Sequence, residues 1–470
     1  MQTDSELSPF RAVFKAYDVR GTVPDQLDEK MVWAVGGAFA DFVVEDGAER
    51  IVIGRDMRES GVGLSHAFAE GVLARGLGVV DAGMVSTDLL YFASGTLSLP
   101  GAMLTASHNP ANYNGMKLCR SGARPIGSES GLADIRTLAE RILGEAPDGV
   151  GSGPLRGREG YEEADLLQAF AHHVRSFLTA ELRPLKVVAD TANGMGGLVA
   201  PVVFAGLPVD LEIIYGELDG NFPNHPADPI QPENLADLRA RVLEVGADAG
   251  LAFDGDADRV FLVDELAEPL SGSLTTAIVA AAMLEVHPGA TILYNLICSK
   301  AVPEVVRERG GIPVRTRVGH SFVKATMAGT GAVFGGEHSG HYYFRDNFRA
   351  DSGIIAALVT LGVMSAAGEP LSELRRPFER YADSGEINTE VGDASAVLAG
   401  VRERFAAVGA DIDSLDGLTV DLGEWWFNLR PSNTEPLLRL NLEAGDDLSC
   451  AKHVKEVLAL VSELDEKEEH

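Results

Sequence analysis

RIVIGRDMRESG, at residues 50–61, indicates a buried strand, a polar turn and the start of a helix, and this order decides the fold class. Two later stretches repeat it: LKVVADTANGMGG at residues 185–197 and ATILYNLICSKAVPEVV at residues 290–306. Each begins with a short run rich in β-branched residues, breaks at Gly, Asp or Asn, and resumes with helix-compatible spacing. Buried strands that alternate with helices are typical of βαβ units. The sequence therefore predicts an α/β fold with mostly parallel sheets.

The chain is long enough for several such modules. Its 470 residues allow roughly three or four domains of about 100–150 residues. A Gly/Pro-rich stretch at residues 144–157 indicates a surface connection, and the pattern changes again near residue 265. A helical run, SGIIAALVTLGVMSAAG, then leads to a smaller final domain. We expect domains at residues 1–152, 153–265, 266–376 and 377–470.

Composition narrows the partners and the compartment. The chain carries 39 Lys and Arg against 70 Asp and Glu, a formal charge of −31, which disfavours nucleic acid and anionic membranes as partners. No apolar run reaches the ~18–20 residues of a membrane span, and the N-terminus lacks an export signal, so we expect a cytoplasmic protein. The three cysteines (Cys119, Cys298 and Cys450) are too scattered for a disulfide framework or a zinc site.

The loop LTASHNPANYNGMKL, residues 104–118, follows an apolar run that indicates a strand. It places a hydroxyl (Ser107), an imidazole (His108) and an amide (Asn109) side by side, and the following proline stiffens the turn. Lys117 follows a glycine in what we expect to be a second short turn, from which it can return to the same pocket. An ordinary polar turn, in which serine caps a helix, explains the loop equally well when it is viewed alone.

The loop LAFDGDADRVFLVDE, residues 251–265, joins two expected strands. Asp254, Asp256 and Asp258 alternate, so a turned backbone can direct all three carboxylates to one side. Three hard oxygen ligands suit Mg²⁺, and three carboxylates this close repel one another unless a cation joins them. An EF-hand is excluded because Arg259 stands where its loop requires glycine. We therefore favour a magnesium site over a solvated acidic turn.

Two further loops carry polar side chains at close spacing. In FGGEHSGHYYF, residues 334–344, a carboxylate, a hydroxyl and an imidazole (Glu337, Ser339 and His341) suit the hydroxyls of a sugar ring. A glycine-rich hairpin with solvated side chains is the alternative for this loop.

The last loop, FNLRPSNTEPLLRL at residues 427–440, combines a guanidinium with hydroxyl and amide groups. Arg430, Ser432, Asn433 and Thr434 can enclose a dianionic phosphate, with arginine making two-pronged contacts. A capped turn punctuated by two prolines is the alternative here.

Taken together, these loops resemble the α-D-phosphohexomutase superfamily, and within it the phosphomannomutase/phosphoglucomutase group. Five motifs carry the resemblance in the family's order: KAYDVRG (15–21), TASHNP (105–110), DGDADR (254–259), GEHSGH (336–341) and RPSNTEP (430–436). The resemblance implies three similar α/β domains with mostly parallel mixed sheets, followed by a TBP-like α+β domain, around a central cleft.

The resemblance also implies roles at matching positions. Ser107 matches the serine that carries the phosphoryl group, and as phosphoserine it joins Asp254, Asp256 and Asp258 as a ligand of Mg²⁺. The other implied catalytic positions are Lys117, a proton carrier whose pKa we expect to be depressed, together with His108 and Arg259. The implied substrate-binding positions are Glu337 and Ser339 for the sugar hydroxyls, Arg430, Ser432, Asn433 and Thr434 for the non-reacting phosphate, and Tyr17, Arg20, Asn109, His320 and His341 elsewhere in the cleft.

The implied activity is interconversion of hexose 1-phosphate and hexose 6-phosphate, of mannose or glucose, through a 1,6-bisphosphate that also serves as activator. One departure stands at Ile297, where related dual-specificity enzymes often have lysine; Lys300 lies close enough in sequence to substitute. Phosphoglucosamine mutase is an alternative, although its phosphate loop usually has glycine where Asn433 stands. A metal-dependent sugar phosphatase and a non-catalytic sugar-phosphate sensor are more distant alternatives. We expect a monomer or a homodimer.

Overall fold

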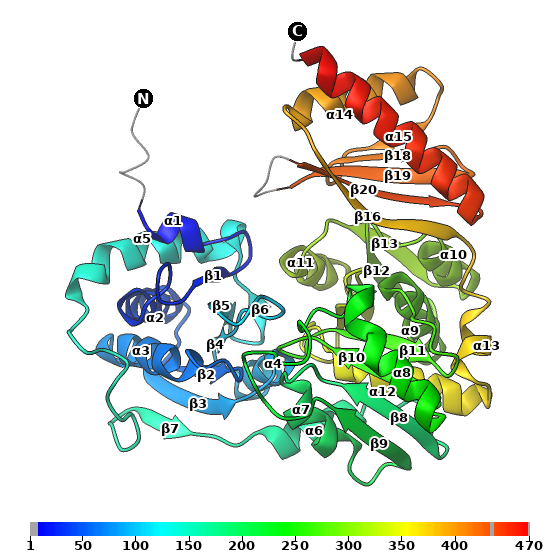
Figure 1. The fold of residues 1–470 in the computed structure, drawn as a ribbon. Helices are drawn as coiled ribbons and strands as arrows, with labels where there is room; N and C mark the ends of the chain where they lie inside the picture. Colours follow the sequence, from blue (N-terminus) through cyan, green and yellow to red (C-terminus); the bar gives the residue numbers. More distant parts are fainter. Residues whose placement is uncertain (1–7, 433–436, 469–470) are drawn as a thin grey trace. The chain divides into compact units, whose positions relative to one another are not determined.

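The computed structural model describes residues 8–432 and 437–468 (Figure 1). These residues form two compact units. The first contains the described residues up to Ser271 together with Gly319–Phe334 and Ser339–Leu374. The second contains Gly272–Val318, Gly335–His338 and the described residues from Arg375 onward.

The first sheet of the first unit is mixed, with the order β1-β5-β4-β2-β3-β7 and β6 paired to β5. The strands β4, β2, β3 and β7 run parallel, whereas β5 is antiparallel to β4, β1 and β6. Its strands are β1 (Val19–Thr22), β2 (Arg50–Arg55), β3 (Gly78–Met84), β4 (Gly101–Leu104), β5 (Tyr113–Arg120), β6 (Arg124–Pro125) and β7 (Tyr161–Glu163). Since β7 lies beyond residue 152, the first sheet extends past the expected domain limit, and the exact limits stay a prediction.

Helices flank the first sheet and bury its core. They are α1 (Phe10–Val13), α2 (Glu29–Val44), α3 (Gly61–Ala74), α4 (Thr87–Leu97) and α5 (Ala133–Ile142). Figure 1 shows α2, α3 and α5 grouped together, and their apolar side chains form one core with β2, β3, β4 and β5. Two glycines let α2 and α3 approach closely: a Cβ on Gly36 would lie 2.3 Å from the Phe68 carbonyl oxygen, and one on Gly71 2.1 Å from that of Trp33.

The second sheet of this unit has the order β11-β10-β8-β9. Its strands β8 (Leu185–Asp190), β9 (Val209–Ile214) and β10 (Ala249–Phe253) are parallel, and β11 (Val260–Asp264) is antiparallel to β10. Its helices are α6 (Leu167–Arg175), α7 (Gly196–Phe204) and α8 (Ala236–Val245). The unit also includes α11 (His320–Thr330), β15 (Tyr342–Phe344) and α12 (Gly353–Ala367), while β14 (Phe334–Gly336) and α13 (Leu371–Arg375) lie at the limits of its segments.

The second unit combines a third α/β segment with an antiparallel sheet. The α/β segment contains α9 (Gly272–Val286), β12 (Thr291–Asn295), α10 (Ala301–Glu308) and β13 (Ile312–Thr316), with β12 and β13 parallel. The antiparallel sheet contains β16 (Ala382–Glu390), β17 (Asp411–Asp413), β18 (Leu418–Asp421), β19 (Trp425–Pro431) and β20 (Leu437–Ala444). Apolar side chains of this sheet pack with those of α14 (Ala394–Ala406) and α15 (Asp447–Glu468).

The three stretches that predicted the fold form β2–α3, β8–α7 and β12–α10, so the α/β prediction is confirmed. The final domain is built on an antiparallel sheet, as expected for a domain of a different type. Among the residues that the structure describes, every helix is too short or too polar to cross a bilayer.

Candidate active site

Ser107 lies on the loop after β4, at the carboxyl edge of the first sheet. Its backbone has a left-handed conformation (φ 50°), which is uncommon for a residue other than glycine. Ser107 Oγ donates a hydrogen bond of 2.8 Å to Asp254 Oδ2, on the loop after β10. The two loops therefore meet with the serine hydroxyl against the acidic cluster.

The three aspartates form a compact group, with one ligand oxygen from each of Asp254, Asp256 and Asp258 within 4.8 Å of the others. All three side chains are buried, and within the described residues Oδ1 of Asp256 and of Asp258 has no hydrogen-bond partner. Buried carboxylate oxygens without partners are costly, and a bound cation removes that cost. The donor set therefore fits a hard divalent cation.

Two features hold the acidic loop in place. Thr87, at the start of α4, donates from Oγ1 to Asp256 Oδ2 at 2.6 Å, and its N–H donates to the Asp256 carbonyl at 3.0 Å. Gly255 lies against the serine loop, where a Cβ would be 2.5 Å from the Ser107 carbonyl oxygen. The close approach of the two loops therefore depends on glycine at this position.

Lys117 lies on β5 and not in a turn, because residues 116–119 of β5 pair with β4, with Lys117 opposite Met103. Its ammonium nevertheless reaches the expected pocket, 2.7 Å from Asp256 Oδ2 and 2.6 Å from Asp258 Oδ2. Burial would lower the pKa of Lys117, but the two carboxylates outweigh burial and hold the pKa well above its usual range. The expectation of a depressed pKa is therefore wrong: the ammonium is stabilised as a cation. Lys117 in turn holds the pKa of Asp256 well below its usual range, against the effect of burial.

Arg259 and His108 lie beside the serine and the aspartates. Arg259 Nε donates to Asp254 Oδ2 at 2.9 Å, and Nη1 lies 3.6 Å from Asp228 Oδ1. The Arg259 side chain is buried, and Nη2 has no hydrogen-bond partner within the described part of the chain. His108 is exposed, with Nδ1 3.3 Å from Ser107 Oγ. This unit therefore offers a guanidinium donor and an imidazole next to the serine hydroxyl.

His341 extends the cluster on the side of Asp258. Its Nδ1 lies 2.9 Å from Asp351 Oδ2 and 3.7 Å from Asp258 Oδ1. Burial would lower the pKa of His341, but the two carboxylates outweigh it and raise the pKa. Asp351 is itself held by Lys324, whose Nζ lies 3.0 Å from Asp351 Oδ1.

The remaining predicted positions of the first unit lie in smaller groups. The rings of Tyr17 and His320 are 5.4 Å apart, and burial, reinforced by the nearby Lys324 ammonium, lowers the pKa of His320 to about 3. Arg20 donates to Asn109 Oδ1 and to an aspartate two residues before it in the chain. Ser339 is half-buried, two residues before His341.

The second unit holds Glu337, Arg430 and Ser432. Glu337 is buried and accepts a hydrogen bond of 3.1 Å from Asn295 Nδ2. Arg430, on β19, lies 3.6 Å from a carboxylate oxygen of Glu386, and Ser432 donates its N–H to the Leu437 carbonyl. Asn433 and Thr434 lie outside the described residues.

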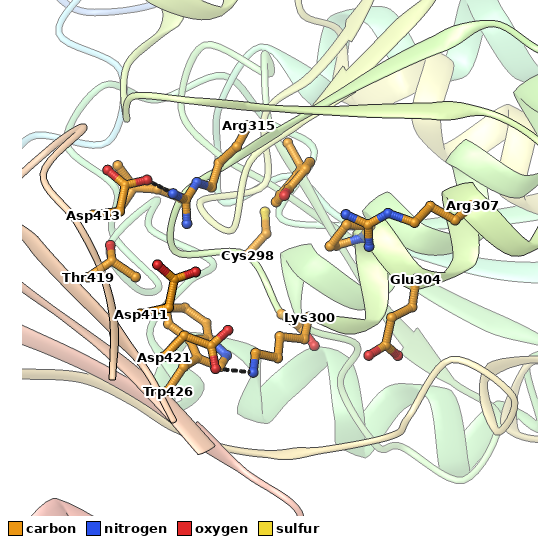
Figure 2. A pocket seen from close by; sticks show the side chains of 14 residues that line it. Cys298, Lys300, Glu304, Arg307, Arg315, Asp411, Asp413, Thr419, Asp421 and Trp426 are labelled. Atoms are coloured by element: carbon orange, nitrogen blue, oxygen red, sulfur yellow. Dashed lines mark hydrogen bonds and ion pairs between the residues drawn. The ribbon is translucent and has the colours of Figure 1, made fainter. Parts of the chain in front are cut away.

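The Lys300 side chain lines a pocket of about 320 Å³ in the second unit (Figure 2). Lys300 Nζ donates to Asp421 Oδ1 at 2.6 Å and to the Gly423 carbonyl at 3.0 Å, and Figure 2 shows it reaching toward Asp421. Arg315 forms an ion pair with Asp413 in the same pocket. Lys300 is therefore engaged by the antiparallel sheet, whereas Ile297 is buried.

Sequence reasoning missed several buried polar residues that hold the site. They are Asp56, Arg58 and Asp351 outside the helices, Thr87 at the start of α4, and Lys324 within α11. The loop with Asp56 and Arg58 belongs to the stretch that predicted the fold. It follows β2, which is parallel to β4, so the carboxyl ends of both strands share one edge of the sheet. The position of Asp56 and Arg58 after a strand that neighbours β4 was therefore the sequence signal that could have placed them near Ser107.

Comparison with known proteins agrees with this geometry. The four domains of the phosphoglucomutase/phosphomannomutase family match residues 11–143, 166–267, 271–381 and 386–460. A phosphomannomutase of Salmonella montevideo is 39% identical over 460 residues, covering 96% of this chain and 98% of that protein. A protein of Xanthomonas campestris pv. campestris named "phosphohexose mutases" is 39% identical over 437 residues, covering 92% and 95%.

A solved structure of a phosphoglucomutase/phosphomannomutase family protein from Burkholderia thailandensis matches with a TM-score of 0.85 and 32% identity, covering 97% of this chain and 98% of that one. Metal use is a property of the superfamily, and the three aspartates can bind a metal ion. Because the chain is similar to phosphomannomutases over nearly its full length, we conclude that it is a phosphohexomutase. The chain thus belongs to the phosphoglucomutase/phosphomannomutase family of the α-D-phosphohexomutase superfamily.

Proposed function

We propose that the chain interconverts the 1-phosphate and 6-phosphate of mannose, glucose or both, with Ser107 as the phosphoryl carrier. The observation that carries this is the hydrogen bond of 2.8 Å from Ser107 Oγ to Asp254 in a buried three-aspartate cluster. Mannose phosphate is the first substrate to test, because several relatives are named phosphomannomutase.

In the first half-reaction, the bond between phosphorus and Ser107 Oγ breaks and a bond to the free hydroxyl of the hexose phosphate forms. The hydroxyl loses a proton and Ser107 Oγ gains one, so the step is balanced. The resulting 1,6-bisphosphate turns round, and its other phosphate returns to Ser107 by the reverse chemistry. The same bisphosphate, added in trace, activates an enzyme whose serine has lost its phosphate.

The described residues suit these tasks. Asp254, Asp256 and Asp258, with phospho-Ser107, would hold Mg²⁺, which withdraws charge from the transferring group. Lys117, kept protonated by its two carboxylates, suits a proton donor to the Ser107 oxygen better than a resting base. Arg259 has an unused buried donor group for a phosphate oxygen.

The other positions bind substrate in this proposal. Glu337 and Ser339 contact the sugar hydroxyls, and Arg430, Ser432, Asn433 and Thr434 hold the phosphate that is not reacting. Tyr17, Arg20, Asn109, His320 and His341 contact the substrate elsewhere, and His108 acts beside Ser107. Related dual-specificity enzymes often have lysine where this chain has Ile297. Since Lys300 is paired with Asp421, we propose that Lys300 does not take over the role of that lysine.

The decisive assay supplies mannose 1-phosphate, glucose 1-phosphate or glucosamine 1-phosphate, each with Mg²⁺ and a trace of the matching 1,6-bisphosphate. Formation of mannose or glucose 6-phosphate supports the proposal, and the rates rank the sugars. Preference for glucosamine phosphate would make the chain a phosphoglucosamine mutase. Release of inorganic phosphate without isomerisation would indicate a phosphatase, and binding without turnover a sensor. Sedimentation of the purified protein distinguishes a monomer from a homodimer.

A further inference from the structure

The guanidinium of Arg58 lies inside the loop that carries Ser107. Nη2 donates to the carbonyls of Ser107 and Asn109, both at 2.7 Å. Nη1 donates to the carbonyls of Pro110 and Tyr113, at 2.7 and 2.9 Å. One side chain therefore satisfies four backbone oxygens of a single seven-residue turn, residues 107–113.

Arg58 is itself fixed from the other side. It is 2% exposed, and its Nε donates to Asp56 Oδ2 at 3.2 Å. The same carboxylate oxygen accepts from Thr105 Oγ1 at 2.7 Å, and Thr105 Oγ1 accepts the N–H of Ser107 at 2.9 Å. Arg58 and Asp56 thus reach Ser107 through both its carbonyl and its N–H.

The loop after β9 closes over this arrangement. The Phe222 ring lies over Arg58, with its centroid 5.2 Å from Cζ, a cation–π distance. A Cβ on Gly220 would lie 2.7 Å from the Arg58 Cα, so the covering loop packs directly on the arginine backbone. Enclosure of this kind limits the freedom of the guanidinium.

A left-handed serine needs such support. A non-glycine residue with φ 50° costs roughly 1–3 kcal/mol and persists only where its surroundings hold it. Arginine has five N–H donors in a rigid planar fork, whereas lysine has three on a flexible stem. Only arginine can reach four carbonyls and a carboxylate from one position.

We propose that Arg58 is a positioning residue for phosphoryl transfer: it fixes residues 107–113 so that Ser107 Oγ stays aimed at the Asp254 carboxylate. The proposal rests on the role of Ser107 as phosphoryl carrier. Arg58 acts through the backbone of the loop: among the described residues, its side-chain hydrogen bonds go to backbone carbonyls and to Asp56, and none goes to the three aspartates of the acidic cluster.

The test is the Arg58→Lys variant, assayed with mannose 1-phosphate, glucose 1-phosphate and Mg²⁺. We expect kcat to fall by about 10²-fold, the cost of a displacement of roughly 1 Å at a reacting group, while KM changes little. Single-turnover transfer from phosphorylated Ser107 should slow by the same factor. Arg175→Lys is the matched control, because Arg175 also donates to backbone carbonyls, those of Val202 and Val203, at a place outside the serine loop; it should keep its kcat.

A folded Arg58→Lys variant with wild-type kcat overturns the proposal, as does a fall in kcat that Arg175→Lys shares. If Arg58→Lys does not fold, Arg58→Gln, with two donors and no charge, is measured in its place; failure of both to fold makes Arg58 structural and also overturns the proposal. Activity that survives in Ser107→Ala would instead refute the carrier role. The two failures are therefore distinguishable.

Discussion

Ser107 combines strain and burial with an acidic neighbour, three properties that an ordinary polar turn does not need together. Its left-handed backbone, 4% exposure and contact with Asp254 all favour chemistry over capping. Strain of this kind is concentrated at functional sites because it is held there by the surrounding structure.

Ser107→Ala should lower turnover by at least about 10³-fold, because alanine cannot carry a phosphoryl group. Binding of hexose phosphate should persist, since the substituted atom is one of many that contact the ligand. Coupled turnover and calorimetric binding measure the two effects. Turnover near that of the wild type in a variant that binds normally would rule out the serine carrier.

Asp256→Asn should raise the magnesium concentration needed for half-maximal rate by about tenfold or more, a loss typical even of residues that only support metal ligands. The amide retains the shape of the carboxylate but removes the charge that pairs with Lys117 and that, in our proposal, binds the metal ion. A magnesium titration of the rate measures the shift, with Asp148→Asn, at an exposed site outside the cluster, as the acidic control. An unchanged titration curve would remove Asp256 from the metal site.

At the scale of elements, two loops from different sheets meet at Gly255, and its contact with the Ser107 carbonyl leaves no room for a side chain. Gly255→Ala should therefore push the loops apart and lower kcat by about 10²-fold. Gly329→Ala in α11 is the control, because nothing lies within 4 Å of its added Cβ. Comparable rates in both variants would show that the loop approach does not matter for catalysis.

The loop after β9 depends on a histidine whose two ring nitrogens both face acceptors. His225 Nε2 lies 3.0 Å from Asp190 Oδ2, and Nδ1 lies 2.9 Å from the Pro226 carbonyl. Burial would lower the pKa of His225, but these acceptors outweigh it and raise the pKa. Because the folded pKa is above the unfolded one, the pair stabilises the fold fully below about pH 6.5 and stops doing so as pH rises through the folded pKa.

The wild type should therefore lose more thermal stability than His225→Gln between about pH 6 and pH 9, by a difference of about 1 kcal/mol or less for a partly exposed pair. Melting curves at both pH values measure it, and His172→Gln, at an exposed site on α6, is the control. Equal losses in the wild type and His225→Gln would show that the pair does not stabilise the loop.

The sequence predicts the elements that local patterns define, but not the contacts between residues that are distant in sequence. The strand–turn–helix order of residues 50–61 is local, so it predicted β2 and α3 correctly. The sequence predicts a turn at Lys117, because no local pattern reveals the pairing of Lys117 with Met103, fourteen residues before it. The raised pKa of Lys117 escaped prediction for the same reason: both of its carboxylates come from another sheet. The contacts of Arg58 escaped prediction because four of its five side-chain hydrogen bonds go to backbone carbonyls, which have no sequence pattern.

On the scale of the whole molecule, each unit is held by contacts that cross its sheets. Within the second unit, Lys300 and Arg315 of the α/β segment pair with Asp421 and Asp413 of the antiparallel sheet. Partly exposed pairs of this kind contribute about 0–1 kcal/mol each and fix orientation more than stability. The large apolar cores of the first sheet and of the antiparallel sheet carry the stability.

The net charge of −31 opposes compaction, because 70 acidic residues face only 39 basic ones and like charges repel one another. Salt at about 0.15 M shortens the Debye length to ~8 Å and screens this repulsion. It also weakens exposed ion pairs, but these contribute little individually.

The melting temperature of the magnesium-free protein should therefore rise by roughly 2–4 °C between low salt and about 0.15 M NaCl. Near pH 4.7, where the net charge is close to zero, the same salt step should give a smaller rise. A fall in melting temperature at neutral pH would mean that surface ion pairs, rather than the excess of like charge, dominate the electrostatics of the fold.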